Sequence, residues 1–114
     1  MELLIIVLNK TEFLNDLLSV LVEAGVTHAT ILDSEGMGHH LAYEVPIFAG
    51  LSRLVGEPKA HNKTILALIK DKTVVKELQK ILKESNIDFS RSGTGIVFTI
   101  PVNMVIKSSN DIEE

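Results

Sequence analysis

Apolar residues along the chain fall into short continuous runs and longer helical stripes. Continuous runs occupy Leu3–Leu8 and Thr64–Ile69, and their β-branched residues without polar alternation indicate strands covered on both faces. A stripe with helical spacing follows each run. The stripes consist of Phe13, Leu14, Leu17, Val20, Leu21 and Ala24, and of Val74, Val75, Leu78, Ile81 and Leu82. The pattern therefore predicts two strand-helix units.

The two units form a concealed internal repeat. Placing Leu3–Val26 over Thr64–Ile87, an offset of 64 minus 3 or 61 residues, puts all 11 apolar residues of the second segment on apolar residues of the first. Residues that favour helix termini recur in both units: the N-cap candidates Thr11 and Asp71, one residue away from the 61-residue offset, and the C′ candidates Gly25 and Asn86, at that offset. We predict the same architecture in both halves.

A further strand candidate follows each helix, at Ala29–Asp33 and at Ile96–Ile100. The order β-α-β-β-α-β predicts an α+β, ferredoxin-like fold, a four-stranded antiparallel sheet with two helices on one face. The other face of the sheet then lacks a cover within the chain, although its strands are apolar on both sides. We therefore predict an oligomer with cyclic symmetry whose subunits cover that face.

Composition bounds the possible functions. A chain of 114 residues that is 46 % apolar predicts a single folded domain over residues 1–114. The net charge, 11 minus 15 or -4, argues against nucleic acid and anionic membranes as partners. The lack of cysteine excludes disulfides, thiolate zinc sites and thiol nucleophiles. Leu3–Leu8 is too short for a signal peptide or a membrane span, so the expected location is the cytoplasm.

The connection between the second and third strands, residues 39–62, is too long for a simple turn. Pro46 and Gly56 frame a stripe with helical spacing, which predicts a short helix. The stripe consists of Ile47, Phe48, Leu51, Leu54 and Val55. It either packs on the sheet or a neighbouring subunit, or serves as a movable arm that docks a partner protein through Ile47, Phe48 and Leu51. We expect the tail, residues 108–114, to be flexible.

Two glycine-rich segments are candidates for a ligand site. Gly36 and Gly38 follow the second strand, and Gly93 and Gly95 precede the fourth. Glycines at this spacing permit positive φ angles and let a ligand approach backbone amides closely. In a ferredoxin-like sheet the two segments would meet across a subunit boundary. The alternative for the first segment is a flexible exit from the strand.

The sequence does not support an enzyme or a metal site. It contains no G-x-S-x-G, P-loop or H-E-x-x-H motif. His39 and His40 would point to opposite sides of an extended segment, so a metal would also need His28, His61 or Glu44. The other carboxylates considered lie on the solvent side of predicted helices: Glu12, Asp16, Glu23, Glu77 and Glu84.

Three stretches resemble the PII signal-transduction family of trimeric nitrogen-regulatory proteins. They are EAGVTHAT at Glu23–Thr30, EGMG at Glu35–Gly38 and SGTGIVFTIPV at Ser92–Val102. The resemblance implies a homotrimer that binds ATP or ADP in clefts between subunits. It also implies that residues 39–62 form the family's T-loop, which controls transporters and enzymes. Such a trimer would cover the open face of the sheet.

The resemblance also implies which residues line the cleft. One wall would consist of Thr30, Gly36, Gly38 and His39, and the other of Gly93, Gly95 and Lys107. The chain departs from the family where cations bind phosphates: His39 replaces an arginine, Ile96 a lysine, and Lys107 and Ser109 two later arginines. Each charge-assisted contact to a phosphate contributes about 1.5 to 3 kcal/mol to binding. Because several of these cations are missing, the identity of the ligand stays open: ATP, ADP, AMP, another molecule or no ligand at all. Tyr43 lies too near the loop root to inherit the modification known in relatives.

The leading hypothesis is a PII-like trimeric regulator without catalytic activity, in nitrogen or related metabolism. A small ligand in the cleft would change the conformation of the long loop. One alternative is a CutA-like trimer that binds metal through His39 or His40 and Glu44. The other is a ligand-free interaction module that uses the stripe in residues 47–55 as a permanent interface.

Overall fold

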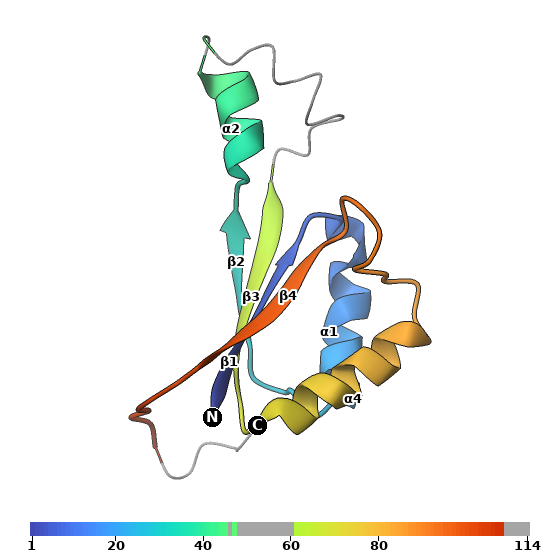
Figure 1. Cartoon of the computed structure of the whole chain (residues 1–114), viewed down its shortest axis with the longest axis vertical. Coiled ribbons are helices and arrows are strands. Elements are labelled where there is room, and N and C mark those ends of the chain that lie inside the picture. Colours follow the sequence, from blue (N-terminus) through green and yellow to red (C-terminus); the bar gives the residue numbers. More distant parts are fainter. Residues whose placement is uncertain (46, 48–60, 109–114) are drawn as a thin grey trace.

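A computed structural model describes residues 1–45, 47 and 61–108, and only the backbone of residues 39, 42 and 43. The elements are β1 (Glu2–Leu8), the 3₁₀ turn η1 (Thr11–Phe13), α1 (Leu14–Glu23), β2 (Thr30–Ser34), α2 (Met37–Glu44), β3 (Asn62–Ile69), α4 (Lys72–Lys83) and β4 (Gly95–Pro101). The strands form one antiparallel sheet in the order β2-β3-β1-β4. Helices α1 and α4 lie on the same face of it (Figure 1). The ferredoxin-like prediction is confirmed. Among the helices described, none is long and apolar enough to cross a membrane.

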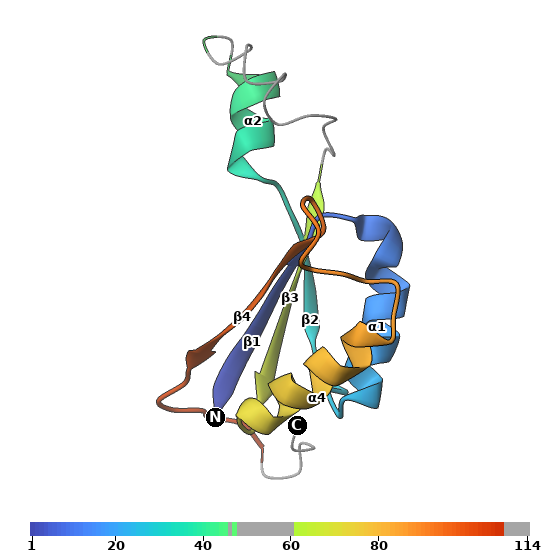
Figure 2. The same ribbon diagram turned by 45° about the vertical axis from the view of Figure 1, so that its right-hand side comes forward.

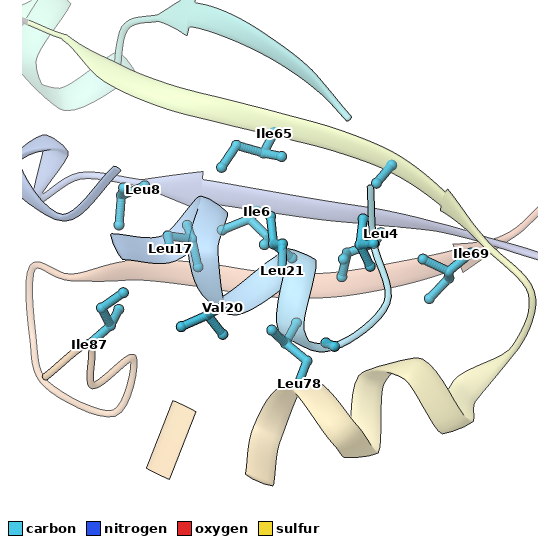
Figure 3. Close-up of a cluster of buried hydrophobic side chains, with 13 residues drawn as sticks. Leu4, Ile6, Leu8, Leu17, Val20, Leu21, Ile65, Ile69, Leu78 and Ile87 are labelled. Carbon is cyan, nitrogen blue, oxygen red and sulfur yellow. The ribbon is translucent and has the colours of Figure 1, made fainter. Parts of the chain in front are cut away.

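The core lies between the sheet and these two helices. Strand alternation directs every second residue of β1 and β3 toward the helices, where six side chains are buried: Leu4, Ile6, Leu8, Ile65, Ala67 and Ile69. They pack with Leu17, Val20 and Leu21 of α1 and with Leu78 of α4 (Figure 3). The internal repeat thus corresponds to β1-α1 and β3-α4, whose apolar positions face one common core.

The opposite face of the sheet is also apolar, and no described helix covers it (Figure 2). The register places Ile5 of β1 between Leu66 of β3 and Phe98 of β4. On edge strand β4, Ile96, Phe98 and Ile100 are 55 %, 42 % and 44 % exposed. Apolar side chains on both faces of β1 and β3 explain why these strands lack polar alternation. The predicted uncovered face is therefore present in the single chain.

The helix ends confirm two of the four predicted caps. Gly25 follows α1 with a φ of +94°, as predicted for a C′ residue. Thr11 is not the N-cap of α1, because the chain first makes the 3₁₀ turn that Thr11 begins. Asn86 is not a left-handed residue, because no described non-glycine residue has a positive φ. Ser85 satisfies the end of α4 instead, with its hydroxyl donating to the Leu82 carbonyl at 2.8 Å.

Asp71 caps the start of α4, as predicted. Its carboxylate accepts hydrogen bonds from the Thr73 amide at 2.8 Å and from the Thr73 hydroxyl at 2.5 Å. These bonds stabilise the charged form, so they lower the pKa of Asp71 below its ordinary value of 3.8. With aspartate at this position, the cap is therefore strongest when the carboxylate is ionised.

We expect the contribution of Asp71 to stability to disappear in acid. Because its pKa is lower in the folded chain than in the unfolded chain, the contribution is complete above about pH 4 and is lost as the pH falls through the folded pKa. Asp71→Asn keeps an acceptor at the cap but cannot titrate, so its urea midpoint should fall less steeply below about pH 4 than that of the wild type. Asp16→Asn, at an exposed position of α1, is the control. Equal slopes for wild type and Asp71→Asn would contradict the prediction.

The structure differs from the sequence prediction directly after β2. Residues 37–44 form α2 instead of an extended exit, and Gly38 lies inside this helix. His39 and His40 are therefore successive helical residues, about 100° apart around the axis, and the argument from an extended backbone is wrong. The helix predicted between Pro46 and Gly56 lies outside the described residues, as do residues 109–114 of the predicted flexible tail.

Candidate functional site

Both glycine segments lie at the same end of the sheet. At this end β1 and β2 finish and β3 and β4 begin, since Leu8 pairs with Gly95 in antiparallel register. Gly36 follows β2, and Gly93 precedes β4. Strands β2 and β4 are the two edges, and with β3 and β1 between them they are separated by about 14 Å, three strand spacings. Within one chain, the two glycine segments therefore lie at the same end of the sheet but at its opposite edges.

The second glycine segment is a turn held against the end of β1. The Thr94 carbonyl accepts hydrogen bonds from the Asn9 amide at 2.9 Å and the Lys10 amide at 3.4 Å, and Thr94 is buried. Gly93 and Gly95 have φ angles of +85° and +146°, as expected for this segment. Apart from its chain neighbours, no atom of the described residues lies within 4 Å of a Cβ built on Gly93, so its backbone is open to a ligand.

The first glycine segment has a different geometry from the one predicted. Gly36 has a φ of -75° and is the N-cap of α2, where its carbonyl accepts the His40 amide at 3.0 Å. Gly38 has no positive φ either, because it lies inside the helix. His40 Nδ1 lies 3.2 Å from Glu35 Oε1, and this contact joins the first turn of α2 to the exit of β2. The segment presents a helix start rather than a left-handed turn.

A polar network that the sequence analysis missed joins three strands at this end. The Asn62 side-chain amide donates to Asn9 Oδ1 at 3.1 Å. The Ser34 hydroxyl contacts Asn62 Oδ1 and lies 2.8 Å from the Thr64 hydroxyl. These residues come from β3, β2 and the residue after β1, so only the strand register brings them together. They fix the ends of the strands next to both glycine segments.

Three cations lie near this end, and the sequence analysis included none of them in the site. Lys63 on β3 pairs with Asp33 on β2, and this hydrogen bond and the charge of Lys63 lower the pKa of Asp33. Lys10 contacts the glycine turn through its backbone. Arg91 Nε lies 3.7 Å from Asp88 Oδ2. Their positions follow from the sheet and its turns, which a linear pattern does not reveal.

The other predicted site residues lie elsewhere. Thr30 begins β2 and pairs with Leu66 on the uncovered face. Lys107 is exposed in the segment after β4. This segment starts at the other end of the sheet, where the Val102 amide donates to the Met1 carbonyl at 3.0 Å; Figure 2 shows β4 ending near the N-terminus. A single chain therefore does not bring Lys107 to the glycine segments.

The structure describes few of the residues that were predicted to bind a partner or, in the alternative, a metal ion. Ile47 is 84 % exposed, whereas Phe48 and Leu51 lie outside the described residues. Over residues 1–45, 47 and 61–108, no three His, Asp or Glu side chains form a group that would hold a metal ion. The side chain of His39, one of the proposed metal ligands, is not described.

Comparison with known proteins identifies the family. The fold is similar to that of the Arabidopsis thaliana PII protein in its complex with citrate, with a TM-score of 0.60 and 17 % identity over 96 % of this chain and 83 % of the other. It is also similar to a PII-like signaling protein of Thermus thermophilus, with a TM-score of 0.54 and 15 % identity over 87 % and 82 % of the two chains. No curated protein matches the sequence significantly. The family model for nitrogen regulatory protein P-II matches residues 1–111, and the chain therefore belongs to the P-II family.

Proposed function

We propose that this P-II protein is a non-enzymatic, cytoplasmic regulator that works as a homotrimer. It binds a small ligand between subunits and controls a partner protein of nitrogen or related metabolism through its long loop, residues 39–62. One observation carries the proposal: the uncovered sheet face is apolar, and the two glycine segments lie at the same end of its opposite edges. In one chain the apolar face is uncovered and the two glycine segments are apart. In a ring of chains, neighbouring subunits would cover the face and bring the segments together.

The topology supports a cyclic assembly. Rotation about an axis roughly parallel to the strands brings edge strand β2 of one subunit toward edge strand β4 of the next. Such a rotation keeps the same end of every sheet on the same side, so Gly36 of one subunit approaches Gly93 and Gly95 of its neighbour. The uncovered faces then turn toward the axis and bury Ile96, Phe98 and Ile100.

The proposed crevice favours a ligand with modest negative charge. Backbone amides at the start of α2 and the open backbone of Gly93 supply hydrogen-bond donors, and Lys10 and Arg91 supply positive charge nearby. Ile96 and His39 stand where relatives carry cations. An adenine nucleotide with few phosphates, such as AMP or ADP, therefore fits this set of residues better than ATP.

Ligand binding would control the long loop, residues 39–62, by conformational linkage. The first part of this connection is α2, whose N-cap Gly36 also belongs to the proposed crevice. A ligand that contacts Gly36 and Gly38 prefers one arrangement of α2, and a partner that binds the same arrangement raises ligand affinity by the same factor. Ile47, Phe48 and Leu51 are the proposed partner contacts. Replacing Phe48 and Leu51 with serine should abolish partner binding without changing the molar mass of the oligomer.

Light scattering and titration calorimetry test the proposal together. We expect a molar mass of three times 12.5 kDa, or about 37.5 kDa, and heat of binding with at least one of ATP, ADP, AMP and cyclic AMP. A monomer at micromolar concentration would remove the shared crevice. Heats equal to those of dilution for all four nucleotides would exclude adenine nucleotides as ligands.

Substitutions of single lysines locate the ligand. Lys10→Ala should weaken nucleotide binding, because Lys10 lies beside the glycine turn. Lys107→Ala tests whether Lys107 contacts the ligand in the trimer, because a single chain places this residue away from the glycine segments. Lys72→Ala, at the start of α4, removes an exposed charge at the other end of the fold and is the control.

A further inference from the structure

A separate pocket lies on the helix side of the protein. It has a volume of about 600 Å³ and is formed by α4 and the segment that follows it. Pockets of this size hold a small ligand or a few residues of a peptide. The pocket lies away from the uncovered sheet face and contains neither glycine segment. Its lining residues are Lys76, Gln79, Lys80, Leu82, Lys83, Ser85, Ile87, Asp88 and Phe89.

The pocket combines an apolar floor with a cationic rim. Leu82, Ile87 and Phe89 are buried or partly buried members of the core and its margin, so they form a fixed apolar surface. Lys76, Lys80 and Lys83 are spaced i, i+4 and i+7, which places them on one side of α4. Over this spacing their Cα atoms extend about 10 Å along the helix axis.

None of the three lysines forms an ion pair with a described residue, although the Asp88 carboxylate lines the same pocket. Helix α4 contains four lysines and one glutamate, a charge of +3, whereas the whole chain carries -4. The remaining chain therefore carries -7, and α4 is a local positive strip on a negative protein. Such a strip attracts an acidic partner that the rest of the surface repels.

Among the described lining residues Asp88 is the only one with a carboxylate, and local hydrogen bonds hold it. It accepts hydrogen bonds from the Ser90 amide at 2.9 Å and the Ser90 hydroxyl at 2.5 Å, and these bonds lower its pKa. Arg91 Nε lies 3.7 Å from its second oxygen. Asp88 thus orders the turn after α4, while its charge opposes an anion in the pocket.

We propose that this pocket docks an acidic peptide segment of a partner protein, with one apolar side chain on the floor and carboxylates at the three lysines. The length of the lysine row favours a peptide over a compact anion, because a single phosphate would reach only one or two of the lysines. The peptide site does not need the trimer, since the proposed subunit interface is the opposite face of the sheet. At its Asp88 end it adjoins the proposed nucleotide crevice, because Asp88 pairs with Arg91.

Titration calorimetry with a defined peptide tests this site on the full chain. The probe is acetyl-Glu-Asp-Glu-Phe-Leu-Glu-Asp-Glu-amide, and its matched control has serines in place of Phe and Leu. We expect the serine peptide to bind at least about tenfold more weakly, because it keeps the charge but leaves the floor empty. Equal affinities would show that charge alone attracts the peptide and would overturn the proposal.

Variants of the protein distinguish peptide binding in the pocket from nonspecific electrostatic attraction. Lys80→Glu, on the rim, should weaken peptide binding at least about fivefold, whereas Lys72→Glu makes the same charge change on α4 outside the pocket and should have a smaller effect. Asp88→Asn should strengthen binding, because it removes the opposing charge while keeping an acceptor for Ser90. Circular dichroism checks that each variant folds. Any of three results would overturn the proposal. These are equal effects of the two lysine variants, weaker peptide binding by Asp88→Asn, and tighter binding of a single-stranded RNA octamer than of the peptide.

Discussion

Gly95→Ala is expected to destabilise the protein by at least about 3 kcal/mol, or to prevent folding, as measured by urea denaturation. A Cβ at this position would lie 2.1 Å from the Val7 carbonyl oxygen, a distance that real Cβ atoms essentially never show. The φ of +146° is a further obstacle, since side chains are strained there. Because Val7 lies in central strand β1, the clash is with backbone and cannot be relieved by a side-chain rotation. Edge strand β4 would have to separate from the sheet at its first residue.

Gly36→Ala is the matched control. Gly36 has a φ of -75°, and a Cβ built on it meets no atom within 4 Å. We expect its unfolding free energy to change by less than about 1 kcal/mol, and loss of nucleotide binding in this variant would then reflect the crevice rather than the fold. If both variants were equally stable, the close approach of Gly95 to β1 would be wrong.

Phe98→Glu is expected to convert the trimer into monomers. Phe98 lies in the middle of β4 on the uncovered face and is 42 % exposed in the single chain. In the proposed trimer it is buried, so each subunit would bury a carboxylate without a partner, at a cost of several kcal/mol. Light scattering should show a change from about 37.5 kDa to 12.5 kDa, with unchanged secondary structure. Nucleotide binding should disappear with the trimer, because the crevice needs two subunits.

Val22→Glu is the control for this experiment. Val22 is an apolar residue of α1, on the other side of the sheet, and is already 60 % exposed. The variant gains the same charge and should keep the molar mass of the wild type. A trimer that survives Phe98→Glu would show that another surface joins the subunits, and it would remove the argument that places Gly36 beside Gly95.

Helix starts and stops were only partly predictable from residue type. The Asp71 cap and the Gly25 stop follow from local chemistry, and both are present. Thr11 and Asn86 are equally good candidates by residue type, but a 3₁₀ turn and the Ser85 hydroxyl serve those ends. Helix α2 was missed because Gly38 inside it has low helix propensity and, together with Gly36 before it, favours a turn in any local analysis.

The sequence by itself determined the order of the four strands and of the two helices that cover the sheet, the two equivalent halves and the existence of a second apolar sheet face. These depend on the spacing of apolar residues, which is a local property of strands and helices. Only the tertiary structure decided which polar and charged residues meet. Asn9, Asn62 and Ser34 are far apart in sequence, and strand register alone joins them. The same register places Gly36 and Gly95 at one end and Lys107 at the other, because neighbouring strands in an antiparallel sheet run in opposite directions.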